Sequence, residues 1–324
     1  MPPTPAVKGL RRDLAVFALA MVAGLAFLAP ADAADGPIRT MRWLAPGADR
    51  VRALSTRPAE CLGRPGDPKD AYEVELGRAA FRTPLVLGGQ AARAGVACET
   101  CHKGGHTNPD FDFPGVSGPP GTADVTSSLF SSHRGDGVDN PKPIPDLGGP
   151  KDRLKVSQAV QGRALESFIH GLVTQEFDGP EPPPAVLDGL AAYVRALSPA
   201  ACPRTVVEPI RAEGYLEDAR RAVRVAGAAL ARGDRATAAL MVDAARSPLG
   251  LIYERYDGRS LAADRDSLKG ADRQLAAAAE AVRAGNPGAG RQLSAWIVLS
   301  RGWGDRLVRD ESRSLFNPRR IAAL

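Results

Sequence analysis

The chain has few residues of the types that usually carry chemistry in proteins. Its 324 residues include only four cysteines, four histidines and four methionines, and aromatic residues make up 5% of the total. The net charge of +5 is small for this length, and no cluster of Lys and Arg alternates with aromatic residues. This composition argues against a nucleic-acid partner, which would need a strong basic patch. A cofactor or metal site must therefore use a small number of cysteine and histidine positions.

Only one long apolar run is present, and it extends from Leu14 to Ala29 near the N-terminus. Basic residues precede it and the small-residue sequence A-D-A follows at 31–33, as in a secretory signal peptide. The run is shorter than the ~20 residues that a membrane-spanning helix needs. We therefore expect residues 1–33 to be a cleaved signal peptide, with an uncleaved membrane anchor as the alternative. On this prediction the mature chain lies in the periplasm and has no transmembrane segment.

Two of the four cysteines lie in the stretch GVACETCHKGGH at 95–106. Cys98, Cys101 and His102 form the pattern C-x-x-C-H, which supplies two thiols at the spacing of the haem vinyl groups and an imidazole for the iron. A zinc site would need four ligands, and no second ligand pair is present unless His106 is included. A redox dithiol would lie in a βαβ unit, which the flanking sequence does not predict. The motif therefore predicts one covalently bound haem c, with His102 as the proximal iron ligand.

The segment around the motif contains few periodic stretches. Within residues 61–203, helical spacing of apolar residues predicts helices only at 70–81 and 184–198. Residues 113–150 are rich in Gly and Pro and are expected to be largely loop. Such a long loop is uncommon in a compact domain, but a large cofactor would give it a surface to pack on. We expect 61–203 to be the haem domain, preceded by a short N-terminal segment, 34–60, of little pattern.

The remaining residues, 204–324, are rich in Ala and Arg and show helical periodicity nearly throughout. The sequence AALARGD at 228–234 is echoed by EAVRAGN at 280–286. Each stretch ends a predicted helix, with Gly at the left-handed cap position. The pattern predicts two helical hairpins, arranged as a four-helix bundle or a TPR-like pair. This bundle contains no cysteine or histidine, so a structural or docking role is expected for it.

The motif and its flanks resemble the cytochrome c superfamily, and more closely one domain of the di-haem cytochrome c peroxidase and MauG-like family. Residues 75–105, 144–168 and 187–198 carry this resemblance, which does not extend to the C-terminal bundle. It implies a mainly α fold, with a cytochrome c-like haem domain followed by the bundle. The chain departs from the family in having one C-x-x-C-H motif, which excludes two-haem chemistry within this polypeptide. It also lacks a Met or His near residue 156, where the family's distal-ligand loop should fall.

The ligand on the second face of the iron is left open by the sequence. Met41 and Met241 lie outside the haem domain, so methionine ligation is not expected. His170, in an apolar helical stretch before the last helix of the domain, and His133, in a Gly-rich loop, are the candidate distal ligands. His106 is expected at the surface or near the haem propionates. If neither candidate binds the iron, the sixth coordination position is open or holds water.

Cys61 and Cys202 are expected to form a disulfide. They bracket the haem domain, and an exported protein permits such a bond. The resemblance to cytochromes c supports the pairing, because the first and last helices of that fold cross and would bring the two ends of the segment together.

Together these features predict an exported mono-haem c-type cytochrome. Its expected function is one-electron transfer with a protein redox partner that the sequence does not identify. The alternative is an enzyme or sensor, a peroxidase-like or peroxide-sensing haem protein with an open sixth coordination position.

Overall fold

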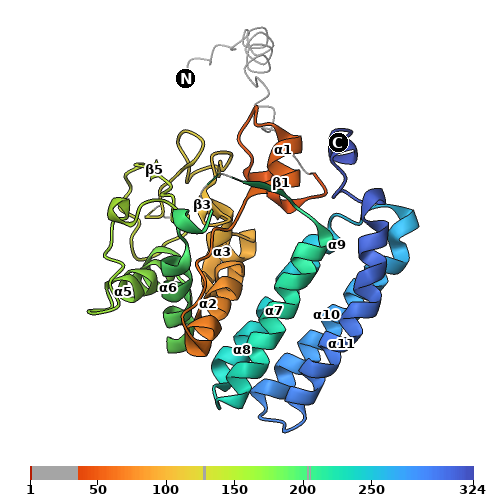
Figure 1. Ribbon diagram of the computed structural model, residues 1–324. Helices are drawn as coiled ribbons and strands as arrows, with labels where there is room; N and C mark the ends of the chain where they lie inside the picture. The colour runs from red at the N-terminus through yellow and green to blue at the C-terminus, as the bar shows by residue number, and fades with distance from the viewer. Residues whose placement is uncertain (2–35, 127–128, 203, 205) are drawn as a thin grey trace. The chain divides into compact units, whose positions relative to one another are not determined.

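The computed structural model describes residue 1 and residues 36–126, 129–202, 204 and 206–324. The expected signal peptide, 1–33, lies outside the described residues except for its first residue. From residue 36 onward the chain forms one compact unit that is mainly helical, as the sequence predicted (Figure 1). Within the described ranges, no helix is long and apolar enough to cross a membrane.

The first half of this unit contains the motif and six short or medium helices. They are α1 (Arg50–Ser55), α2 (Pro68–Phe81), α3 (Gly89–Ala94), α4 (Cys98–Cys101), α5 (Ala164–Gly171) and α6 (Pro184–Ala196). A π-helical turn, Leu172–Glu176, follows α5 directly. The helices expected at 70–81 and 184–198 are confirmed as α2 and α6, with small shifts at their ends. Proline at the first position fixes the start of each, because its missing N–H has no partner there in any case.

Helices α2 and α6 cross in close contact. Gly77 of α2 meets Gly189 of α6, and a Cβ added at Gly77 would lie 1.8 Å from the Gly189 carbonyl oxygen. Two glycines therefore let the backbones approach more closely than any side chain would allow. Near the crossing, the rings of Phe81 and Tyr193 pack with their centroids 4.9 Å apart. The structure thus brings α2 and α6, the first and last helices expected in this segment, into contact.

The strands are few and short. The described residues contain three two-stranded antiparallel sheets: β1 (Thr56–Pro58) with β6 (Val207–Pro209), β2 (His102–Lys103) with β3 (His106–Thr107), and β4 (Thr122–Ala123) with β5 (Lys142–Pro143). Apart from β4 and β5, the described residues between 113 and 150 are irregular, as expected. The N-terminal segment, for which the sequence gave no pattern, forms a 3₁₀ turn at Arg39–Trp43, then α1 and β1. Through β1 and β6 it pairs with the chain that joins the two halves.

The second half is a helical bundle with a short C-terminal helix. Its helices are α7 (Ala212–Ala231), α8 (Arg235–Ala244), α9 (Arg246–Tyr253), α10 (Ala262–Arg283), α11 (Ala289–Asp310) and α12 (Pro318–Ile321). Helix α7 packs on α8 and α11, and α10 packs on α8 and α11, so four helices surround one core (Figure 1). The two predicted glycine caps are present, because Gly233 and Gly285 have φ angles of +77° and +68°.

One hydrophobic core runs through both halves. Leu76 and Ala80 of α2 belong to the same cluster of buried residues as Leu216 and Ala219 of α7. Helix α2 therefore packs against α6 within the first half and against α7 across the junction. A smaller cluster ties the N-terminal segment to the C-terminus; it consists of Ile38, Met41, Leu54, Leu315 and Ile321. The expected haem segment and the bundle thus stabilise one another.

Candidate functional site

The motif cysteines lie on one short helix that is fixed at both ends. In α4, Cys98 and Cys101 are three residues apart and therefore share a face of the helix. The Thr100 hydroxyl accepts a hydrogen bond from the Ala97 N–H at 3.0 Å. At the other end, Asn108 donates its backbone N–H to the Cys101 carbonyl at 2.9 Å. Both thiols are free and pack against the hydrophobic core, so they are held together in an apolar setting.

The histidine of the motif has a defined orientation. His102 Nδ1 lies 3.0 Å from the carbonyl oxygen of Pro145, far along the chain. A carbonyl can only accept, so Nδ1 must carry the proton and Nε2 keeps its lone pair. The Phe81 ring lies beside the imidazole, with the ring centroids 6.3 Å apart. Burial lowers the pKa of His102 to about 4, although the Pro145 carbonyl opposes this shift, so the imidazole is neutral at pH 7.

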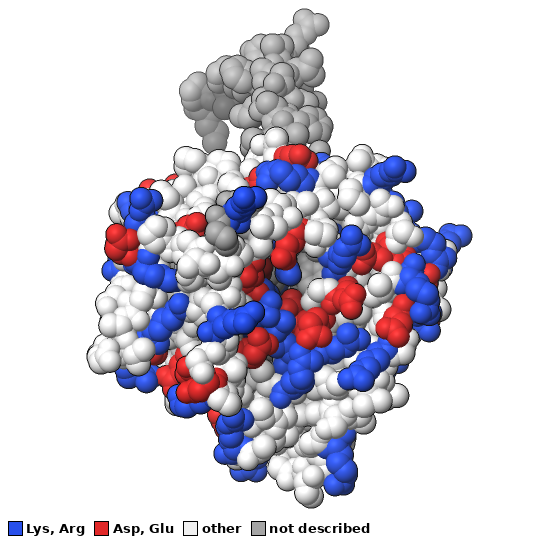
Figure 2. Space-filling view, viewed as in Figure 1, with Lys and Arg blue, Asp and Glu red and all other residues white. Residues whose placement is uncertain are grey.

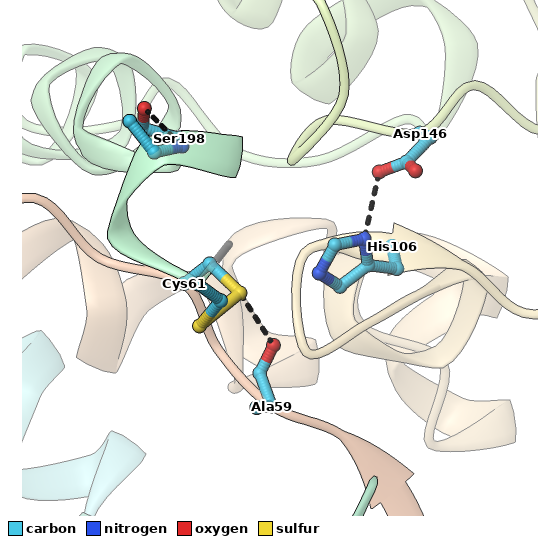
Figure 3. The surroundings of a disulfide bond; sticks show 7 residues. Ala59, Cys61, His106, Asp146 and Ser198 are labelled. Carbon is cyan, nitrogen blue, oxygen red and sulfur yellow. Dashed lines mark hydrogen bonds and ion pairs between the residues drawn. A yellow bond between two sulfur atoms is a disulfide. The ribbon is translucent and has the colours of Figure 1, made fainter. Parts of the chain in front are cut away.

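The Pro145 carbonyl is held in place by a second set of contacts. The Asp146 carboxylate lies 2.9 Å from His106 Nδ1 and also accepts the backbone N–H of Gly148 at 2.9 Å. The same Gly148 N–H lies 2.9 Å from the Gly105 carbonyl. Figure 3 shows the His106 ring pointing toward Asp146. His106 is thus a partly exposed residue that joins the turn after the motif to the loop carrying Pro145.

The turn after the motif requires glycine. Gly104 and Gly105 have φ angles of +62° and +81°, a region that side chains disfavour. A Cβ at Gly104 would lie 2.5 Å from the Pro58 carbonyl oxygen, and one at Gly105 would lie 2.7 Å from the Leu197 side chain. The motif is therefore pressed against the N-terminal segment and the end of α6.

The chemistry of the thiols does not fit the two alternatives to haem. Burial raises the pKa of Cys98 and of Cys101 to about 12, whereas a reactive dithiol needs at least one thiol with a lowered pKa. For zinc, the described ranges bring no three His, Cys, Asp or Glu side chains together in a group that could hold a metal ion. Two neutral thiols beside one neutral imidazole do match the donor set that a thioether-linked haem needs.

The two candidate distal histidines each contact a carboxylate near the surface. His170, at the end of α5, has its Nε2 2.9 Å from Glu181, and its side chain is 39% exposed. His133 has its Nε2 3.7 Å from Asp178, and its side chain is 66% exposed. Either residue would have to leave its carboxylate to bind iron. Both therefore remain predictions as distal ligands.

The two methionines outside the haem domain are enclosed elsewhere. Met41 is buried in the small cluster with Leu54 and Leu315, between the N-terminal segment and the C-terminus. Met241 is fully buried on α8 of the bundle. Met41 thus belongs to a cluster separate from the one that the motif cysteines contact, whereas Met241 lies in the bundle part of that large core.

The predicted disulfide is confirmed. Cys61 and Cys202 are joined, with their Cα atoms 5.2 Å apart. The Ser198 N–H donates to the Cys61 carbonyl at 2.8 Å, and Leu62 forms a β-bridge with Leu197. Figure 3 shows the bond where the chain entering α2 runs beside the chain leaving α6. The disulfide thus joins the two ends of the predicted haem segment.

Sequence reasoning missed Pro145 and Asp146. The stretch IPDLGGP at 144–150 marks a turn, but no local pattern predicts that a backbone carbonyl within it will accept a hydrogen bond from His102. Comparison with known proteins adds no further constraint: no family model, no curated protein and no solved structure matches the chain.

Proposed function

We propose that this protein is an exported mono-haem c-type cytochrome that carries out one-electron transfer. Cys98 and Cys101 would hold the haem through thioether bonds, and His102 would bind the iron. Bound haem would supply a reversible one-electron couple. The observation that carries the proposal is the contact between His102 Nδ1 and the Pro145 carbonyl, which leaves Nε2 as the only lone pair of the ring. Two free thiols on the adjoining helix complete the set.

The chain's own residues orient and shield such a group. The Pro145 carbonyl holds the imidazole in one tautomer and makes it a better donor, as the outer partners of ligating histidines do. Asp146 and His106 hold the loop that carries this carbonyl. The apolar cluster that contacts both thiols keeps water from that side, and exposure to water is one of the terms that set a haem potential.

The location and the partner follow from the sequence. The N-terminal pattern favours export to the periplasm, where haem attachment and the Cys61–Cys202 bond are both possible. A redox partner protein is required, because a one-electron carrier must both receive and deliver its electron. Without a methionine ligand we expect a lower reduction potential than that of a His/Met cytochrome, since binding of a methionine sulfur to the iron raises the potential.

Covalent attachment is the decisive test. Mature protein made in a periplasm with haem-attachment machinery should keep its colour after denaturing extraction. Replacing both motif cysteines by serine (Cys98→Ser with Cys101→Ser) should give colourless protein. The matched control is Cys61→Ser with Cys202→Ser, which also removes two cysteines but should retain covalent haem. Equal haem content in the motif variant and the wild type would rule the proposal out.

A second candidate function is favoured by one observation. His133 and His170 both contact carboxylates, and the sequence from His102 to Cys202 contains no methionine. This arrangement suits an open sixth position, as in a peroxidase-like or peroxide-sensing haem protein. The ferric and ferrous spectra with and without CO distinguish the two functions. A low-spin spectrum that becomes high-spin in His170→Ala or His133→Ala identifies that residue as the ligand. Ready CO binding by the wild type, unchanged in both variants, supports the open site.

A further inference from the structure

A cavity of about 130 Å³ lies where the motif, the N-terminal segment and the bundle meet. Its wall includes Glu99 and Thr100 from α4, Arg57 from β1 and Asp218 from α7. One water needs about 10–15 Å³ of such space, so the cavity has room for several waters or one small ion. Charged side chains of both signs also crowd the molecular face around the junction of the two halves (Figure 2). The haem site proposed above makes no use of this cavity.

The charged lining of the cavity is mainly basic. Its cationic side chains are those of Arg39, Arg57, Arg82, Lys103 and Arg255. Two carboxylates, those of Glu99 and Asp218, belong to the described lining. Behind the wall, Arg39, Arg57 and Arg82 also pair with Glu254, Glu208 and Glu60.

Two of these cations form no ion pair with a carboxylate among the described residues. Arg255, only 2% exposed, donates to the backbone carbonyls of Leu54 and Leu315, each at 2.9 Å. Lys103 donates to the Ala53 carbonyl at 2.6 Å. A carbonyl satisfies a hydrogen bond but does not neutralise a charge. Glu99 and Asp110 attract the Lys103 ammonium without pairing with it directly. A buried charge without a direct counter-charge is costly, so this part of the protein favours a bound anion.

Several buried polar atoms around the cavity have no hydrogen-bond partner within the described chain. They include the donors Arg57 Nε and both Nε and Nη1 of Arg82. The acceptors Glu99 Oε2 and Asp218 Oδ2 are in the same situation. Arg82 Nη2 donates to Glu60 at 2.9 Å, and Arg82 Nε lies 3.6 Å from Asp218 Oδ2, beyond hydrogen-bond distance. Arg82 Nε and Nη1 therefore make no hydrogen bond within the described chain. The site thus offers more donors than its own residues accept.

We propose that this cavity binds one small oxyanion, of the size and chemistry of inorganic phosphate. Arg57 and Arg82 would donate hydrogen bonds to its oxygens. The positive charges of Arg255 and Lys103 would neutralise its negative charge. Water alone could satisfy the donors but would add no negative charge beside Arg255 and Lys103, which form no ion pair within the described part of the chain. Guanidinium groups suit such a ligand, because their N–H groups match the oxygens of phosphate in pairs.

Titration of the full-length mature protein with inorganic phosphate, followed by calorimetry at constant ionic strength, tests the proposal. We expect one phosphate per chain. Arg57→Gln should weaken binding about tenfold, as the loss of one charge-assisted hydrogen bond implies. Arg42→Gln is the matched control: it removes an exposed arginine of the same N-terminal segment and should leave the affinity unchanged. Glu99→Gln should tighten binding, because it removes the carboxylate that opposes the anion.

The result does not depend on haem attachment, so it can be read on protein with or without colour. Absence of heat with phosphate, sulfate and acetate would overturn the proposal and leave a hydrated cavity. Equal phosphate affinity in Arg57→Gln and the wild type would place the anion elsewhere and overturn it as well. If Arg57→Gln does not fold, Glu99→Gln decides the matter, because an unchanged affinity in that nearly isosteric variant contradicts the assigned site.

Discussion

At the scale of single residues, Glu60 is the centre of a buried charge network between α2 and α6. Its side chain is 5% exposed, accepts a hydrogen bond from the Tyr193 hydroxyl at 2.5 Å, and pairs with Arg82 and Arg78. Burial by itself would raise the pKa of Glu60. The two guanidinium groups and the tyrosine outweigh it and lower the pKa from 4.5 to about 2. The carboxylate is therefore stabilised in its charged form by the fold.

This shift predicts an acid-dependent loss of stability. Because the pKa of Glu60 is lower in the folded state, the unfolded state binds more protons, and the stabilisation is complete above pH 4.5 and is lost as the pH falls toward about 2. The full effect is about 3 kcal/mol. Urea unfolding from pH 7 to pH 2 should show it, and Glu60→Gln should be less stable at pH 7 and lack this contribution to the pH dependence.

Glu73→Gln provides the control for this measurement. Glu73 forms an ion pair with Lys69 on the exposed side of α2, and such exposed pairs contribute little to stability. If Glu60→Gln were as stable at pH 7 as Glu73→Gln, the buried network would have no net role.

At the scale of secondary-structure elements, the crossing of α2 and α6 positions the motif. The Gly77–Gly189 contact brings the two backbones together and places Phe81 between Tyr193 and His102. The two helices have no polar motif of their own that would specify this approach. Their contact depends on the absence of side chains at two positions.

Gly77→Ala should therefore destabilise the protein. The new Cβ would overlap the Gly189 carbonyl and force the helices apart, at a cost of about 1–3 kcal/mol or more. Gly227→Ala in α7 is the matched control, because nothing lies within 4 Å of its Cβ position. That change should stabilise the protein by about 0.5–1 kcal/mol, since alanine favours a helix. Chemical denaturation of both variants gives the comparison, and a stabilising effect of Gly77→Ala would show that the crossing can widen freely.

At the scale of the whole molecule, the predicted haem segment and the bundle are parts of one folded unit. A single hydrophobic core extends through both, and the ion pairs Arg82–Asp218 and Arg221–Glu75 cross the junction. The absence of cysteine and histidine from the bundle suggested a separate structural module. In the structure it covers one side of α2 and supplies part of the wall of the cavity behind the motif.

The disulfide stabilises this whole unit rather than one element. Cys61 and Cys202 are 141 residues apart in sequence, and closing so long a loop contributes about 4–5 kcal/mol in the chain-entropy model. Urea unfolding with and without reductant should show a loss of this order. In Cys61→Ser with Cys202→Ser, the reductant should have no further effect. Alkylation of both cysteines in the native protein without reductant would contradict the bond.

The sequence by itself determined the features that depend on local chemistry. The C-x-x-C-H spacing defines the candidate haem ligands, because three reactive groups within five residues must share one turn of chain. The starts of α2 and α6 at proline, and the ends of α7 and α10 before glycine, follow from backbone sterics at single positions. The Cys61–Cys202 pairing was also predictable, because the motif cysteines have another expected use and only these two remain.

Only the tertiary structure decided which distant groups meet. The Pro145 carbonyl contacts His102, 43 residues away in the sequence. Every residue has a backbone carbonyl, so the sequence does not indicate which donor will bond to this one. The N-terminal segment showed no periodicity because its order comes from pairing β1 with β6 and from packing on the C-terminus. The cavity collects arginines from segments far apart in the chain. Each of these features is a contact between residues far apart in the sequence. The local sequence around one residue does not identify its distant partner, so only the folded chain shows which residues meet.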